Sequence, residues 1–124
     1  MPIYPAGSRT PIPMPPLDPD AALDYVLDWN DADDPWLASG ETVAQAEWTV
    51  PAEILIGDGA LSQATKAGSV TPDAPSISGG TLTIGWLWPD VTAVVGTTYT
   101  VEVTVRSSLG RKDSRSFTVL VANR

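Results

Sequence analysis

The stretch "TTYTVEVTVRSS", residues 97–108, decides the fold because apolar and polar side chains alternate over most of its length. The apolar members, which share one face of an extended chain, are Tyr99, Val101, Val103 and Val105. A period of two is typical of a β-strand that is buried on one face and exposed on the other. The stretch therefore predicts a long strand that covers a core.

The next segment repeats the alternation and predicts a β-hairpin. In "RSFTVLVAN", residues 115–123, Phe117, Val119 and Val121 fall on one face, and the intervening "SLGRKD" supplies Gly110 for a turn. Because one face of the pair must be buried, its register is tightly specified. The side chains expected to be buried together on that face are Tyr99, Val101, Val103, Phe117 and Val119.

Three upstream stretches predict further strands by the same pattern. They are "LDYVLDW" (residues 23–29), "ETVAQAEWTVP" (41–51) and "TLTIGWLW" (81–88). The expected apolar faces are Leu23, Tyr25, Leu27 and Trp29 in the first, Ala44, Ala46, Trp48 and Val50 in the second, and Leu82, Ile84, Trp86 and Trp88 in the third. Pro51 ends the second strand because proline cannot donate to a sheet.

Shorter segments complete the pattern. "EILIG", residues 53–57, reads as a short strand, and "SVTPDAPSIS", residues 69–78, as another that is broken by prolines. Residues 58–68 are small and polar without periodicity, which predicts a surface loop. Six to eight short strands with turn residues between them predict an all-β protein, an antiparallel β-sandwich.

Two places favour a single helical turn. Asp18 followed by Pro19 has the form of an N-cap and first helical residue, and we expect one turn there to lead into the strand at residues 23–29. Asp34 followed by Pro35 repeats the pattern, and Gly40 ends it after little more than one turn.

Composition excludes several classes of protein. The 124 residues contain no cysteine and no histidine, so disulfides, thiolate zinc sites and imidazole ligands or bases are absent. No apolar run approaches the roughly 18 residues that span a bilayer, and the first ten residues lack the features of a secretory signal. We expect one soluble domain, without membrane contact, that folds in the cytoplasm where it is made.

The charge is unevenly distributed. No Lys or Arg occurs between Thr10 and Thr65, whereas that half holds most of the carboxylates, and the net charge is −8. We expect no nucleic-acid partner, because phosphate binding needs a concentrated basic surface.

The acidic stretch "DWNDADDPW" offers oxygen ligands of the kind that calcium prefers: Asp28, Asn30, Asp31, Asp33 and Asp34. The spacing does not match an EF-hand, because no glycine makes the sharp turn and Ser39 stands where the bidentate glutamate belongs. We therefore expect a solvated acidic loop with no metal, and we expect added calcium or EDTA to leave the melting temperature unchanged.

No arrangement of residues points to catalysis or to a cofactor. A Ser-His-Asp triad is impossible without histidine, and neither GxSxG nor SxxK occurs. The protein is expected not to be an enzyme. Trp48, Trp86 and Trp88 could form an aromatic platform for sugars, but their shared strand faces favour the core. Trp88, next to Pro89, is expected to be the most exposed of the three.

The N-terminal segment has a different character from the rest. Seven of its first nineteen residues are proline, which removes backbone donors and favours extended conformations. Such a segment could be a spacer, a disordered tail or an arm that becomes ordered on another subunit.

The stretches at residues 17–29, 36–51 and 96–124 together resemble the fibre-tail adaptor family of tailed phages. The resemblance implies an immunoglobulin-like β-sandwich and a place in the virion near the tail or neck, and it brings no site residues. The chain departs from the family by a longer middle, residues 58–78, and by its proline-rich start.

With this resemblance, residues 1–17 are interpreted as an extended N-terminal arm and residues 18–124 as the immunoglobulin-like sandwich. A pre-extended arm loses less entropy on binding than a flexible one. The apolar side chains available to fill pockets of a neighbouring subunit are Ile3, Tyr4, Ile12, Met14 and Leu17. A disordered tail without a partner is the alternative.

The resulting hypothesis is a non-enzymatic virion protein that docks on the tail or neck and connects or stabilises tail fibres. Its partners are then other virion proteins, in a symmetric assembly with several copies of the chain. Two alternatives stay open: a module that binds carbohydrate or the host surface, and a protein that decorates the capsid.

Overall fold

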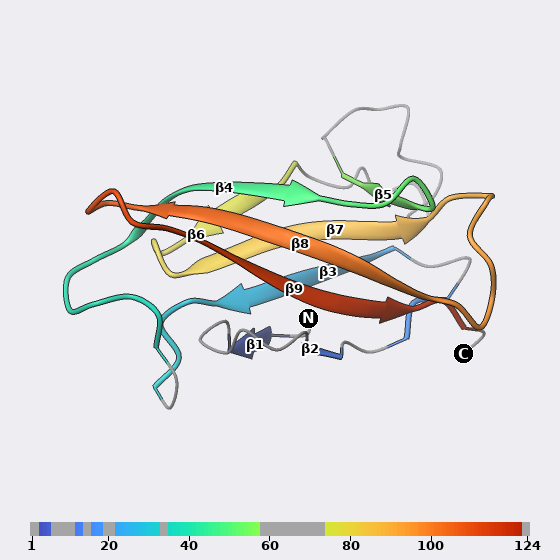
Figure 1. Cartoon of the computed structure of the whole chain (residues 1–124), viewed down its shortest axis with the longest axis horizontal. Helices are drawn as coiled ribbons and strands as arrows, with labels where there is room; N and C mark the ends of the chain where they lie inside the picture. The colour runs from blue at the N-terminus through green and yellow to red at the C-terminus, as the bar shows by residue number, and fades with distance from the viewer. Residues whose placement is uncertain are drawn as a thin grey trace.

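Two β-sheets face each other in the structure, a computed structural model that describes residues 3–5, 12–13, 16–18, 22–32, 35–57 and 74–122 (Figure 1). The predicted loop at 58–68, the helical turn after Asp18 and the cap at Asp34 lie outside these residues. The described strands are β1 (Ile3–Pro5), β2 (Ile12–Pro13), β3 (Leu23–Asp28), β4 (Val43–Thr49), β5 (Ile54–Ile56), β6 (Ser76–Ser78), β7 (Leu82–Pro89), β8 (Thr98–Ser107) and β9 (Lys112–Leu120). In the described ranges no helix is long and apolar enough to span a membrane.

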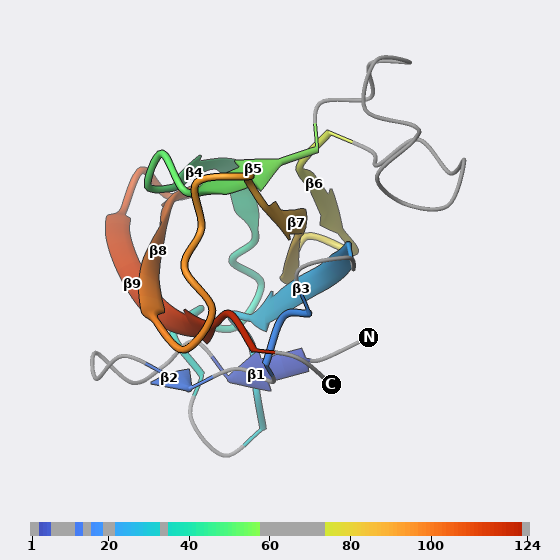
Figure 2. The ribbon, with the colours of Figure 1, turned by 90° about the vertical axis from the view of Figure 1, so that its right-hand side faces the viewer.

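One sheet has the order β1-β3-β7-β5, with β6 also paired to β7, and the other has the order β2-β9-β8-β4. Seen end-on, the two sheets form opposite walls, with β4 and β5 near one edge and β1 and β2 near the other (Figure 2). All pairs from β3 to β9 are antiparallel, which confirms the predicted all-β sandwich. The immunoglobulin-like arrangement stays a prediction, and the facing sets β3-β7-β5 and β4-β8-β9 agree with the B-E-D and C-F-G strands of that scheme.

The predicted hairpin is confirmed as β8 and β9, which pair from Thr98 with Leu120 to Arg106 with Lys112. Val101, Val103, Phe117 and Val119 are fully buried, as their alternation predicts. Tyr99 is only half-buried, so the prediction was wrong for that ring. Tyr99 is the second residue of β8, at the end of the sandwich. Its hydroxyl accepts a hydrogen bond from the backbone N–H of Val94 in the preceding loop, at 2.9 Å, which keeps the ring near the surface.

The apolar face predicted for β7 was wrong. From Leu82 to Leu87 the buried residues are Thr83, Gly85 and Leu87, while Leu82, Ile84 and Trp86 are half-buried on the other face. The inner face is small because large side chains arrive from other strands. A Cβ atom on Gly85 would lie 3.0 Å from the Trp48 indole, so the absence of a side chain there lets that ring lie on the backbone of the facing sheet.

Trp88 is buried, with 3% of its surface exposed, so the expectation that it is the most exposed of the three tryptophans was wrong. It pairs with Leu55 of β5, and its neighbours Leu87 and Pro89 are buried too. Both faces of β7 are thus covered at this end of the strand.

The face predicted for β4 is right for three of its four residues. Ala46, Trp48 and Val50 pack against the core, whereas Ala44 is exposed. The pairing with β8 shifts between Val43 and Gln45, which indicates a β-bulge. A bulge inserts one extra residue and reverses the alternation beyond it, so Val43 is buried in place of Ala44.

The helical turn predicted before Gly40 is absent from residues 35–40. The backbone N–H groups of Trp36 and Leu37 both donate to the carbonyl oxygen of Trp29, at 2.9 and 3.1 Å, which folds this segment back onto the end of β3. Leu37 is buried in the core, and Gly40 has a φ of 78°, in the left-handed region that favours glycine.

Candidate partner-binding surfaces

Two short strands of the predicted N-terminal arm pair with the sheets of the same chain. β1 pairs in parallel with β3, with Ile3 opposite Val26 and Tyr4 opposite Leu27. β2 pairs in parallel with β9, with Ile12 opposite Phe117. Two described pieces of this segment thus pair with strands of the sandwich. Met14 lies outside the described residues.

Leu17 belongs to the core rather than to a binding surface. It has no exposed surface and is part of the buried cluster between the sheets. Its backbone N–H donates to the oxygen of Leu120 at 2.8 Å, and its carbonyl oxygen accepts from the N–H of Ala122 at 3.1 Å. Leu17, which was predicted to bind a partner, is therefore not available to one, because its side chain is buried in the core of its own chain.

The acidic stretch forms a turn after β3. The backbone N–H of Asn30 donates to Oδ1 of Asp28 at 2.9 Å, while Asp33 and Asp34 lie outside the described residues. Within the part of the chain that the structure describes, no three acidic side chains come together as a metal site would require. The expectation of unchanged melting with calcium stays a prediction.

The three tryptophans of the proposed sugar platform do not form one surface. Trp48 points between the sheets, where its ring lies edge-on to Phe117 with 5.9 Å between centroids. Trp88 is buried, and only Trp86 faces outward as a half-buried ring. A flat platform built from these residues is therefore not available.

Glu41 and Arg111 form an ion pair that sequence reasoning missed. Arg111 comes from the β8–β9 turn, and its Nε donates to Oε2 of Glu41 at 2.8 Å while Nη2 binds Oε1. Nη2 also donates to the backbone oxygen of Trp36 at 2.9 Å, and the guanidinium lies 4.5 Å from the centre of the Trp36 ring. Because the two residues are 70 positions apart in the sequence, no local periodicity indicates the contact.

This ion pair fixes the β3–β4 loop to the β8–β9 turn. The buried carboxylate of Glu41 also accepts a hydrogen bond from the N–H of Ala38 at 2.8 Å. The pKa of Glu41 is lowered from 4.5 to about 2. The hydrogen bond from the Arg111 side chain is the largest cause, and the hydrogen bond from the backbone N–H of Ala38 is the next. The pair therefore holds together one end of the sandwich.

Lowering the pH should weaken this contact in a defined window. A carboxyl group whose pKa is lower in the folded state stabilises the protein above its unfolded pKa, and loses that effect as the pH falls toward the folded pKa. The difference in melting temperature between wild type and Glu41→Gln should thus be constant above about pH 5 and shrink between pH 4.5 and 2. Calorimetric melts in this range measure it, and a difference that stays constant down to the acid limit would contradict the assignment.

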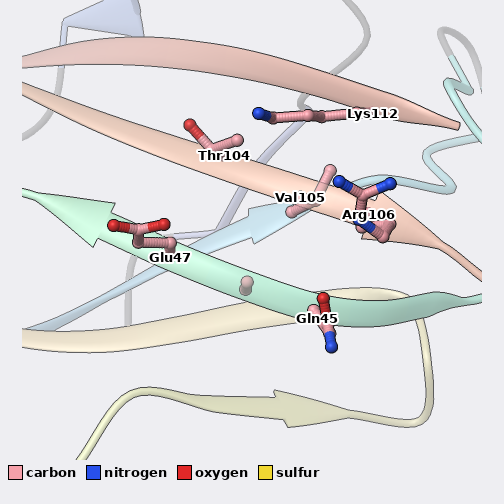
Figure 3. Close-up of a pocket in the computed structure, with 7 residues that line it drawn as sticks. Gln45, Glu47, Thr104, Val105, Arg106 and Lys112 are labelled. Atoms are coloured by element: carbon pink, nitrogen blue, oxygen red, sulfur yellow. The ribbon is translucent and has the colours of Figure 1, made fainter.

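A groove of about 400 Å³ crosses the outer face of the β4-β8-β9 sheet (Figure 3). Gln45 and Glu47 come from β4, Thr104 and Arg106 from β8, and Lys112 from β9. Figure 3 shows Arg106 and Lys112 together on one side, while Glu47 lies farther along the groove. All these side chains except Thr104 are exposed, so the groove is open to a partner.

A second exposed surface lies on the β7–β8 loop. Val91, Val94 and Val95 are 96%, 59% and 50% exposed. The backbone around them is fixed, since the N–H of Gly96 donates to the oxygen of Val121 at 2.6 Å and the N–H of Val121 to the oxygen of Thr97 at 3.1 Å. The valines are thus held outward on an ordered loop.

A protein family described as the podophage GP4 fiber-tail adaptor protein gp77 matches residues 17–120. No individually curated protein matches the chain. The match covers every strand from β3 to β9 and begins at Leu17, the first described residue of the core. The sandwich built around the buried hairpin is thus the matched unit, and the chain belongs to the podophage fiber-tail adaptor family, a family of structural proteins of the virion.

Proposed function

We propose that this protein is a non-enzymatic adaptor that docks on the tail or neck of the particle and connects or stabilises tail fibres. The observation that carries the proposal is the family match over the whole sandwich. An adaptor of this kind acts through surface complementarity, which requires rigid scaffolding and exposed contact surfaces. The groove on the β4-β8-β9 sheet and the β7–β8 loop meet this requirement. In this proposal several copies, made in the host cytoplasm, assemble with other virion proteins.

The N-terminal segment is proposed as a contact with a neighbouring subunit. The family match begins at residue 17, so residues 1–16 are an addition to the matched sandwich. Its described pairings are short: three residues of β1 and two of β2, each of which includes a proline without a backbone N–H. Such short pairings leave few backbone hydrogen bonds to break on release, and Ile3, Tyr4, Ile12 and Met14 are the apolar side chains that the segment would then bring to a partner.

Deletion of residues 1–16 tests this proposal. The shortened chain keeps Leu17 and should melt cooperatively, because strands β3 to β9 are complete without the deleted segment. Its incorporation into particles that lack the wild-type copy should fall. Circular dichroism measures folding, and quantitative mass spectrometry of purified particles measures incorporation. Equal incorporation of the full-length and shortened chains would refute the arm, whereas absence of the full-length chain from particles would refute the adaptor itself.

The structure favours neither alternative function. The sugar-binding alternative depended on an exposed Trp88, and that side chain is buried. Among the residues that the structure describes, no surface singles out decoration of the capsid.

A further inference from the structure

The four basic residues in the described ranges fall into two groups. Arg111 is paired with Glu41, and Arg115 is paired with Asp113 at 2.9 Å. Arg106 and Lys112 make no ion pair or side-chain hydrogen bond there, although the chain carries a net charge of −8. The two basic residues left without a partner in these ranges thus both line the groove on the outer face of the β4-β8-β9 sheet.

Their arrangement in the sheet is unfavourable for the isolated protein. Arg106 of β8 and Lys112 of β9 are directly opposite each other in the antiparallel register. Like charges directly opposite across two strands destabilise a sheet. Glu47 also lines the groove but forms no ion pair with either cation, so it does not neutralise them by direct contact (Figure 3). An anion that enters the groove from outside would relieve the repulsion.

We propose that this groove binds a carboxylate-bearing segment of a different virion protein, with Arg106 and Lys112 as the residues that recognise it. The inference rests on the proposed adaptor function, which makes the partner a polypeptide. A guanidinium can accept a carboxylate in a two-point contact, and the ammonium adds a point charge beside it. Gln45 and Thr104 supply neutral hydrogen-bonding groups along the same groove. A second copy of the chain is the less favourable occupant, because two molecules with net charges of −8 repel each other.

A carbodiimide cross-link tests the contact directly, since this reagent joins an amine to a carboxylate without a spacer. The chain has only two lysines, Lys66 and Lys112, so the linked side chain can be identified by mass spectrometry of treated particles. The expected product joins Lys112 to an aspartate or glutamate of another virion protein, and it should disappear in Lys112→Gln. A link to a second copy, a link only to Glu47 of the same chain, or no link from Lys112 would overturn the proposal.

A pair of matched variants gives an independent measurement. Arg106→Gln/Lys112→Gln lowers the net charge by two, and so does Thr98→Glu/Thr100→Glu at exposed positions toward the other end of β8. Both should fold cooperatively, and the first should melt no lower than the wild type because it removes the repulsion between Arg106 and Lys112. At low salt the first should be incorporated at least tenfold less than wild type into particles that lack this protein, and the second should be incorporated normally. The salt sensitivity of wild-type incorporation should be lost in the first variant.

The outcomes separate the two proposals. If the wild type is incorporated and Arg106→Gln/Lys112→Gln matches it in amount and in salt dependence, the groove inference is wrong and the adaptor function stands. If the wild type is not incorporated at all, both are wrong.

Discussion

Replacing Val101 with aspartate is expected to abolish cooperative folding. Val101 is fully buried, and its neighbour across the hairpin is Phe117. The Phe117 ring stacks on the Tyr25 ring, with 5.6 Å between the ring centroids. A carboxylate at this position would lie among apolar side chains without a partner. The cost is several kcal/mol, comparable to the ~5–15 kcal/mol that stabilise a typical domain.

Val103 would be a weaker test position than Val101, because the two valines have different neighbours across the hairpin. Val103 is opposite Arg115, a buried residue whose guanidinium could neutralise a new carboxylate. Thr100→Asp is the matched control, because it places the same charge on the exposed face of the same strand. Its free energy of unfolding should be within about 0.5 kcal/mol of that of the wild type. Thermal and denaturant unfolding measure both variants, and a cooperative, near-native melt of Val101→Asp would disprove the proposed inner face of β8.

Truncation of Leu17 to alanine should cause the second large loss. Leu17 is fully buried in the core and is bonded through its backbone to the end of the chain. Leu-to-Ala changes at buried sites typically cost about 2–5 kcal/mol, which corresponds to a fall in melting temperature of roughly 10–20 °C for a domain of this size.

Leu109→Ala provides the control, since Leu109 is 69% exposed on the β8–β9 turn and should change stability little. Comparison with the deletion of residues 1–16 locates the boundary of the folded unit. If Leu17→Ala melted like the wild type while the deletion unfolded the protein, the core would depend on the preceding segment and not on Leu17.

The sequence predicted well those strands that alternate cleanly. In β8 and β9 the polar residues between the valines are Thr, Glu and Ser, so only one face could be buried. The prediction for β7 was wrong because its inward residues Thr83 and Gly85 are smaller and less apolar than its outward residues Ile84 and Trp86. The reason lies in distant parts of the chain: Nε1 of Trp29, just after β3, donates to Oγ1 of Thr83 at 3.0 Å, and the Trp48 ring of the facing sheet lies on Gly85. Such matching of large to small residues between distant segments has no local signal.

The candidate surfaces were less predictable than the fold. The prolines favoured extended conformations, but they did not predict that the described parts of the segment pair with β3 and β9 of the same chain. The groove depends on which exposed residues become neighbours across β4, β8 and β9, and on which cations lack a partner. Both depend on the register of strands that are distant in sequence, whereas composition reveals only the total charge.

The pairing of the two ends of the matched sandwich has a mechanical consequence. Leu17 and Val121 form a parallel bridge, and β2 runs parallel to β9 beside it. Tension applied to the two ends of the chain would pull these parallel neighbours lengthwise past each other, so their hydrogen bonds would bear the force together instead of opening one by one. An adaptor loaded through its termini would therefore resist stretching most strongly at this seam, and the force at which single molecules yield should fall when Leu17 is replaced by alanine.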